Sequence, residues 1–135
     1  MNPNLVTPEN LSLDLLKAIL EYAGLEIISQ DDDRLHLRDR SGNGCSLINL
    51  EQTLRLARSF EVEKPSSLQA KLEMANYINN TIPFVRCSLQ EDGALDFDYF
   101  IMMRGGVTRT ALINAVEYFM WMPVKAMERA QKLFE

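Results

Sequence analysis

The feature that most constrains this chain is the apolar run Phe119-Met120-Trp121-Met122-Pro123-Val124. The run lies inside a stretch whose apolar spacing predicts one long final helix. A helix that packs on one core needs a single apolar stripe, whereas this run presents apolar side chains on every side for more than a turn. We therefore expect one copy of the chain to leave part of the run uncovered.

The simplest cover for this run is a second copy, so the sequence predicts a homodimer built around the last helix and the adjoining sheet. Burying one large apolar side chain contributes about 1.5–3 kcal/mol, so a few such residues favour association. Pro123 lacks an N–H and crowds the preceding turn, which predicts a kink or break. The candidate interface residues are Phe119, Met120, Trp121, Met122, Val124 and Met127.

Length and composition suit one folded domain. The chain has 135 residues, of which 47% are hydrophobic and 24% are charged, so we expect a single domain over 1–135 with a loose start at 1–6. The net charge of −5 argues against binding nucleic acid or an anionic membrane. The chain shows no leader pattern and no apolar run of the about 20 residues that span a bilayer, so we expect cytoplasmic residence with reduced thiols.

Changes of apolar period along the chain predict alternating helices and strands. Thr7-Pro8-Glu9 is expected to open a first helix that Gly24 ends, and Ser66 to Gln69 reads as a capping box for a middle helix. Strands are expected at 25–30, 34–38, 45–50, 84–90 and 94–103, and Thr53 to Val62 fits either a strand or a helix. The middle helix is expected to run to about Asn80, with Leu68, Leu72, Ala75 and Ile78 as its apolar stripe. Thr108 is expected to cap the last helix.

This order predicts an α+β fold, an antiparallel sheet with helices packed on it in the order α-β-β-β(β)-α-β-β-α. Asp92-Gly93 marks a tight hairpin turn between the last two strands. On the second of these strands, Phe100 and Met102 follow Asp96 and Asp98 on one face. The apolar end of that face predicts that the far end of the strand is covered on both sides.

Three short segments carry a resemblance to a known family: Ala75-Asn76-Tyr77-Ile78-Asn79, Asp92-Gly93 and Gly105-Gly106-Val107-Thr108. With them, most of 10–135 resembles the YbjN-type family, named as "putative bacterial sensory transduction regulators". The element order is also similar to the fold of type III secretion chaperones. The resemblance implies a bacterial regulatory role with no established reaction or ligand. Where the family often has a large aromatic just before the second Asn, this chain has Ile78.

Two polar groups are candidates for structure or for ligand binding. Asn76 and Asn79 share one helix side, where their amides could tie the helix end to a neighbouring strand or bind a ligand. Gly105 and Gly106 precede a helix N-terminus, which favours a plain turn and leaves an anion site as the alternative. The methionines fill core gaps or form an adaptable interface.

The residue types of a catalytic or metal site do not come together in the sequence. His36 is the single histidine and alternates with leucines, which favours a solvated strand position over a catalytic one. Cys45 and Cys87 lack a CxxC spacing, and Asp31-Asp32-Asp33 and the Asp92/Asp96/Asp98 group lack calcium-loop spacing. We predict no catalytic residue, no metal and no cofactor.

The sequence therefore predicts a non-enzymatic protein-interaction or regulatory domain that acts as a homodimer, with an unknown protein partner. A type III secretion-like chaperone that binds an unfolded client segment is the first alternative. A small-molecule or anion sensor that uses Gly105, Gly106 and the asparagines is the second. An enzyme is the least supported class, because no converging polar pocket is predicted.

Overall fold

The computed structural model describes residues 4–134 and confirms the α+β class. The middle stretch that fitted either a strand or a helix is a strand, β5. The elements in chain order are β1 (Leu5–Val6), α1 (Leu13–Tyr22), β2 (Glu26–Gln30), β3 (Arg34–Arg38), β4 (Gly44–Asn49), β5 (Thr53–Phe60), α2 (Leu68–Thr81), β6 (Arg86–Leu89), β7 (Leu95–Met102), β8 (Val107–Thr108) and α3 (Arg109–Leu133).

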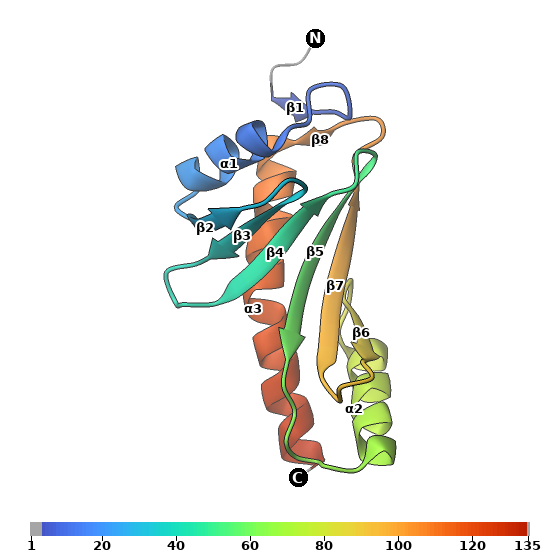
Figure 1. The fold of residues 1–135 in the computed structure, drawn as a ribbon. Helices are drawn as coiled ribbons and strands as arrows, with labels where there is room; N and C mark the ends of the chain where they lie inside the picture. Colours follow the sequence, from blue (N-terminus) through green and yellow to red (C-terminus); the bar gives the residue numbers. More distant parts are fainter. Residues whose placement is uncertain (1–3, 135) are drawn as a thin grey trace.

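The main sheet has six antiparallel strands in the order β2-β3-β4-β5-β7-β6. The helices pack on one face of it: α1 against β2 and β3, α3 across β4, β5 and β7, and α2 against β6 (Figure 1). A second, two-stranded sheet joins β1 to β8 near the N-terminal end of α3. The predicted order is confirmed, and β1 and β8 are additions that no sequence pattern had indicated.

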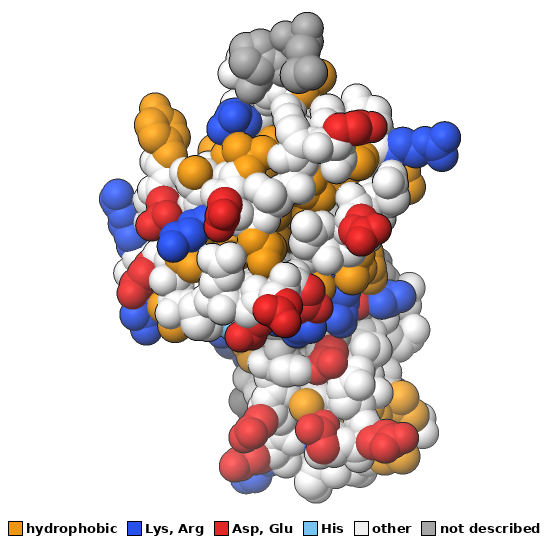
Figure 2. All heavy atoms as spheres, turned by 45° about the horizontal axis from the view of Figure 1, so that its top comes forward, with side chains coloured by type: hydrophobic (Ala, Val, Ile, Leu, Met, Phe, Trp, Pro, Cys, Tyr) orange, Lys and Arg blue, Asp and Glu red, His pale blue; other side chains and the backbone are white. Residues whose placement is uncertain are grey.

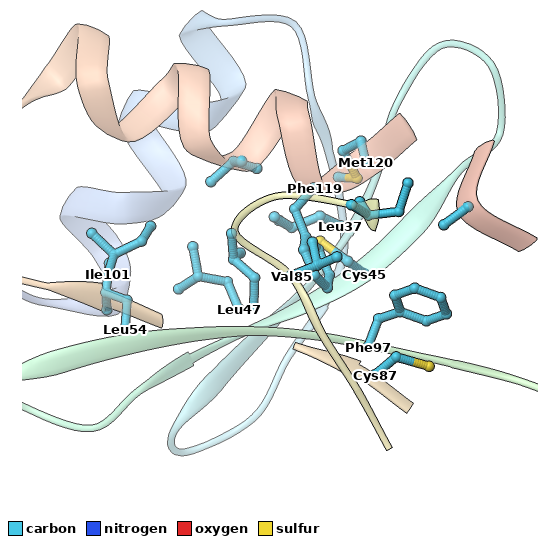
Figure 3. Packing of buried hydrophobic residues seen from close by; sticks show 14 of the residues in the cluster. Leu37, Cys45, Leu47, Leu54, Val85, Cys87, Phe97, Ile101, Phe119 and Met120 are labelled. Atoms are coloured by element: carbon cyan, nitrogen blue, oxygen red, sulfur yellow. The ribbon is translucent and has the colours of Figure 1, made fainter. Parts of the chain in front are cut away.

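The alternation of each strand divides the sheet into a core face and an open face. On β3, β5 and β7 the core-facing residues include Leu35, Leu56 and Phe97, which are fully buried. The core lies between this face and α3, and Phe119 and Met120 belong to the same buried cluster as Leu37, Leu47 and Phe97 (Figure 3). The open face carries the charged and polar residues of the same strands, including Arg34, His36 and Arg55.

The starts of two helices differ from the prediction. Thr7, Pro8 and Glu9 form a turn in which Thr7 and Asn10 exchange hydrogen bonds, and α1 begins later, with the Ser12 hydroxyl accepting from the Leu15 N–H. Ser67 caps α2 in place of Ser66, since its hydroxyl accepts from the Ala70 N–H. A cap depends on where the chain leaves its preceding contacts, which local spacing does not report.

The N-terminus and α2 also depart from expectation. Residues 1–6 were expected to be loose, but Leu5–Val6 form β1 and Val6 is fully buried; residues 1–3 lie outside the described part of the chain. On α2, Leu68 and Leu72 are exposed, and the buried side is formed by Met74, Ala75 and Ile78. The side of α2 that faces the core is therefore rotated about the helix axis from the side that the apolar spacing predicted.

The apolar run of the last helix is mostly covered by its own chain. α3 continues through Pro123 without a break, and Phe119, Met120, Pro123 and Met127 are buried in the single copy. The premise that one copy cannot hide this run is therefore wrong for Phe119 and Met120, and the candidate interface residue Met127, beyond the run, is buried as well. A 25-residue helix that crosses three strands of a twisted sheet presents a wider buried side than one stripe.

Asn79 fastens α2 to β6. Its side-chain nitrogen donates to the Cys87 carbonyl and its side-chain oxygen accepts from the Cys87 N–H, both at 2.8 Å. The amide therefore acts as one more strand residue at the start of β6. Asn76 lies on the exposed side of the same helix and takes no part in this pair.

We expect Asn79→Ala to lower the free energy of unfolding by about 1–3 kcal/mol, because it leaves the buried Cys87 backbone groups unpaired. Asn76→Ala is the matched control and should stay within about 0.5 kcal/mol, as an exposed substitution does. Urea unfolding followed by circular dichroism measures both. Equal effects of the two substitutions would show that the Asn79 amide does not fasten the helix to the strand.

A candidate protein-binding surface

Four aromatic side chains form a continuous row from β7 to the outer side of α3. Tyr99 on β7 and Tyr118 on α3 each lie 6.2 Å from Phe84 between ring centroids, and Trp121 lies 5.6 Å from Tyr118. Trp121 is exposed, whereas Tyr99 and Tyr118 are partly buried and pack against the core. We call Tyr99, Phe84, Tyr118 and Trp121 the aromatic row.

Phe84 is held in an unusual conformation. Its backbone φ is 69°, a region that bulky residues rarely adopt, and its side chain is 77% exposed. The Tyr118 hydroxyl donates to the Pro83 carbonyl at 2.6 Å and so holds the loop against α3. Partial burial, together with nearby Tyr99, raises the pKa of Tyr118, which keeps it a hydrogen-bond donor. Strain that displays an apolar ring to solvent points to a functional role for the ring.

Beside the aromatic row, part of β7 has no neighbour on one side. β7 pairs with β5 over its whole length, from Leu95 to Met102, but with β6 only from Leu95 to Asp98. On the open face of the uncovered half, Phe100 is 46% exposed and Met102 is 71% exposed. The prediction that this end of the strand is covered on both sides is therefore wrong for the single chain.

Charged residues border the uncovered half of β7. Asp98 is buried and accepts from Arg86 at 2.7 Å and from Arg55 at 3.3 Å. The Asp98 hydrogen bond raises the pKa of Arg86, whose guanidinium also lies 5.3 Å from the Phe100 ring centroid. Two guanidinium groups thus share one carboxylate, which leaves this border with an excess of positive charge.

A shallow hollow of about 400 Å³ adjoins the other end of the aromatic row. The C-terminal end of α1, the β3–β4 turn and α3 form its walls, and Trp121 separates it from Tyr118. The lining residues are Ala23, Gly24, Leu25, Asp39, Arg40, Ser41, Glu117, Met120 and Trp121. Trp121, which is 46% exposed, therefore both lines the hollow and contacts Tyr118 of the aromatic row.

The predicted interface residues divide into two groups. Trp121 is exposed, and Met122 and Val124 are partly buried, so these three can contact a partner. Phe119, Met120 and Met127 belong to the core, as described above. Sequence reasoning noted the apolar strand end at Phe100 and Met102 but missed Tyr99, Phe84 and Tyr118, because their grouping depends on where β6 begins and on the rotation of α3.

The predicted polar positions do not form one site. Gly105 and Gly106 make a turn with φ near +90°, and the Gly106 N–H donates to the Met103 carbonyl. The first-turn N–H groups of Arg109 and Ala111 bond the Asn4 carbonyl and the Thr108 hydroxyl, so they already have protein partners. α2, with Asn76 and Asn79, lies at the opposite end of the sheet from β8 (Figure 1).

His36 joins two elements on the open face. Its Nε2 lies 3.1 Å from Asp31 Oδ2, and its Nδ1 lies 3.0 Å from the Ser46 hydroxyl. The order Ser-His-Asp matches a catalytic triad, but a nucleophilic serine also needs N–H donors for an oxyanion, and Ser46 lies mid-strand between β3 and β5. The two hydrogen bonds of His36, to Asp31 and to Ser46, therefore tie the Asp31–Asp33 turn to β4. Within 4–134, no three His, Cys, Asp or Glu residues are grouped as metal ligands.

Surface charge is mixed on the face that Figure 2 shows. Seen from the end that carries β1 and β8, hydrophobic side chains form small patches among interspersed acidic and basic ones (Figure 2). Within the described residues, no helix is long and apolar enough to cross a membrane.

Comparisons with known proteins identify relatives of this fold. The profile of the YbjN family, described as "Putative bacterial sensory transduction regulator", matches residues 12–125. No curated protein matches the sequence significantly.

Three solved structures share the fold. YbjN from E. coli, solved as a putative transcription regulator, is 20% identical with a TM-score of 0.60, covering 92% of this chain and 89% of its own. An uncharacterized protein from Methanothermobacter thermautotrophicus is 15% identical with a TM-score of 0.69, covering 93% and 100%. The heterodimeric ExoU-SpcU complex of the Pseudomonas aeruginosa type III secretion system gives 19% identity and a TM-score of 0.58, covering 87% and 96%.

Phe84→Gly tests whether the left-handed backbone conformation at Phe84 lowers the stability of the fold. Glycine adopts a positive φ freely, which offsets the entropy it adds to the unfolded chain. We expect the free energy of unfolding to stay within about 1 kcal/mol of the original, although a large apolar side chain is lost. Phe97→Ala is the contrast and should cost about 3–5 kcal/mol, because Phe97 fills the core. A large loss for Phe84→Gly in denaturant unfolding would show that the ring serves stability.

The two cysteines are expected to be unreactive in the folded protein. Burial raises the pKa of the Cys45 and Cys87 thiols to about 12, against an ordinary value of 9.0. At about pH 8, a thiol reagent should therefore label the native chain on the order of a thousandfold more slowly than the chain in concentrated guanidinium. Prompt labelling of the native protein would contradict this.

The same shift makes stability depend on alkaline pH. The unfolded chain loses its thiol protons first as pH rises past the ordinary value of 9.0, so the free energy of unfolding should fall from there to about pH 12. Urea unfolding across that range, compared with Cys45→Ala, measures the contribution of one thiol, because the variant should show a smaller alkaline decline.

Proposed function

Since the chain belongs to the YbjN family, we propose that it is a non-catalytic regulatory domain that binds another polypeptide and acts as a homodimer in the cytoplasm. The observation that carries this proposal is the aromatic row, in which Phe84 and Trp121 are exposed, beside an unpaired strand edge. Aromatic side chains grouped on a surface are the usual anchors of protein interfaces. The buried, unpaired cysteines support a reducing compartment.

The dimer contact is proposed to lie on the outer side of α3. Trp121, Met122 and Val124 are the part of the apolar run that the chain itself leaves accessible. Two such helix sides related by a two-fold axis place the same residues against each other, as a two-fold interface requires. Trp121 is the natural anchor, because it combines a large apolar ring with partial exposure.

A chaperone-like role is the second candidate. The structural neighbour from the type III secretion system was solved as a heterodimeric complex, which supports binding of a different protein by a domain of this shape. In this chain, the uncovered half of β7 and the aromatic row are surfaces that an extended client segment could contact. Recovery of one defined client with the chain from its host would favour this role over a purely regulatory one.

We expect the original chain to have twice the monomer mass by light scattering and Trp121→Asp to have the monomer mass, because a charge at the centre of an apolar contact is costly to bury. Leu68→Asp is the control, since Leu68 is also apolar and exposed but lies at the start of α2. It should leave the dimer intact. Monomer mass for the original chain, or an unchanged dimer in Trp121→Asp, would refute the homodimer placement.

A further inference from the structure

The uncovered half of β7 offers its backbone as well as its side chains. Across the β6–β7 turn, the Gln90 N–H donates to the Ala94 carbonyl, so residues 94, 96 and 98 direct their backbone groups toward β6. On the other side, the Met103 N–H donates to the Gln52 carbonyl, so residues 103, 101 and 99 direct theirs toward β5. By this alternation, Phe100 and Met102 point their N–H and C=O groups away from β5, past the end of β6.

An incoming strand would therefore find both hydrogen-bonding groups and apolar contacts. On the open face of the sheet it would pass Phe100 and Met102, which are among the exposed apolar residues. On the helix face it would pass Tyr99 and Phe84 of the aromatic row. A strand that places apolar side chains on both faces fits this edge, because apolar residues border it on both sides.

The charges around this edge select the kind of strand. Arg55, Arg86 and Arg104 lie on or next to the uncovered half, and Asp98 is the carboxylate that pairs with the first two. Two guanidinium groups therefore share one carboxylate at one end of this half and a third guanidinium follows its other end, although the chain as a whole has a net charge of −5. Acidic residues at the ends of the incoming segment would complement these guanidinium groups.

A second copy of the chain fits this edge poorly. If two β7 strands paired antiparallel through their outward-directed residues, with Phe100 of one copy opposite Met102 of the other, Arg104 of one copy would lie opposite Asp98 of the other. Arg86 of that copy is next to this position, since it pairs with Asp98. Like charges would then meet twice, which disfavours self-pairing.

We propose that the edge from Tyr99 to Met102 binds a partner protein by strand addition, and that the added segment is extended, apolar in its centre and acidic at its ends. This inference rests on the proposed protein-binding function and names its site and partner chemistry. The main-chain hydrogen bonds provide affinity, and Phe100, Met102 and Phe84 provide the contacts that select apolar side chains.

The test uses a fluorescein-labelled peptide, Asp-Glu-Val-Thr-Val-Ile-Val-Glu-Asp, with fluorescence anisotropy against the full chain. We expect saturable binding that weakens at least about tenfold when the acidic ends are replaced by lysines, and at least about tenfold in Met102→Glu. Ile28→Glu is the control variant, because Ile28 is similarly exposed but lies on β2 at the other edge of the sheet. It should bind as the original chain does. Circular dichroism verifies that both variants fold.

Two N-methylated peptides separate strand addition from plain apolar contact without altering the protein. One is methylated on its odd central amides and the other on its even ones, so one of them loses the N–H groups that face β7. One peptide should lose at least about tenfold in affinity while the other stays within about threefold. Equal effects of the two, absence of binding by the unmethylated peptide, or equal binding of the lysine-ended peptide would each overturn the proposal.

Failure of this inference and failure of the homodimer are distinguishable. Trp121→Asp lies outside the strand edge, so as a monomer it should still bind the peptide. If the chain dimerises but no peptide binds, the strand-addition site is wrong and the homodimer stands. If Met102→Glu abolishes the dimer itself, the edge is an interface between copies and the proposal is wrong.

Discussion

The packing of α3 across the sheet is the contact on which the rest of this structure depends. The helix crosses β4, β5 and β7, and its buried side includes Val116, Phe119 and Met127. Thr108 fixes where the helix begins, and the pairing of β8 with β1 holds that end against the N-terminal strand. With position and rotation fixed, the accessibility of the remaining side chains is set as well: Trp121 is exposed and Tyr118 is partly buried.

The free strand edge and the exposed ring of Phe84 have one local cause. Pro83 provides no N–H and Phe84 adopts a left-handed backbone, so the chain cannot continue a ladder beside β7 until Arg86. The Tyr118 hydroxyl bond to Pro83 holds this irregular loop on α3. β6 is therefore shorter than β7, and the same loop that shortens it places an aromatic ring next to the uncovered half.

Sequence patterns identified most of the elements because strands and helices impose different apolar periods. The alternation at Arg34 to Arg38 and the turn at Asp92-Gly93 lie in the structure where they were expected. What the patterns could not report was which apolar residues the chain covers by itself. Phe119 and Phe100 each lie in an apolar stretch of the sequence. Phe119 is buried between α3 and the sheet whereas Phe100 is exposed, because burial depends on the neighbouring element.

The candidate surface was harder to predict for the same reason. Its members come from β7, the loop before β6 and α3, and no single segment carries a pattern that joins them. Trp121 was recognised because it belongs to the run Phe119–Val124, which presents apolar side chains on every side of the helix. Phe84 could have been found from its position after Pro83, since a large aromatic residue between a proline and a polar strand is not placed by any apolar pattern on the core side.

An unpaired strand edge is a risk that proteins normally limit, because any exposed edge can pair with another. Here the uncovered half is short, Arg86 stands at its border with most of its side chain in solvent, and Arg104 follows its far end. These guanidinium groups oppose the pairing of identical edges while attracting a strand of opposite charge. The edge is thereby selective, because the same guanidinium groups that disfavour pairing between two copies of the chain favour an incoming segment with acidic ends.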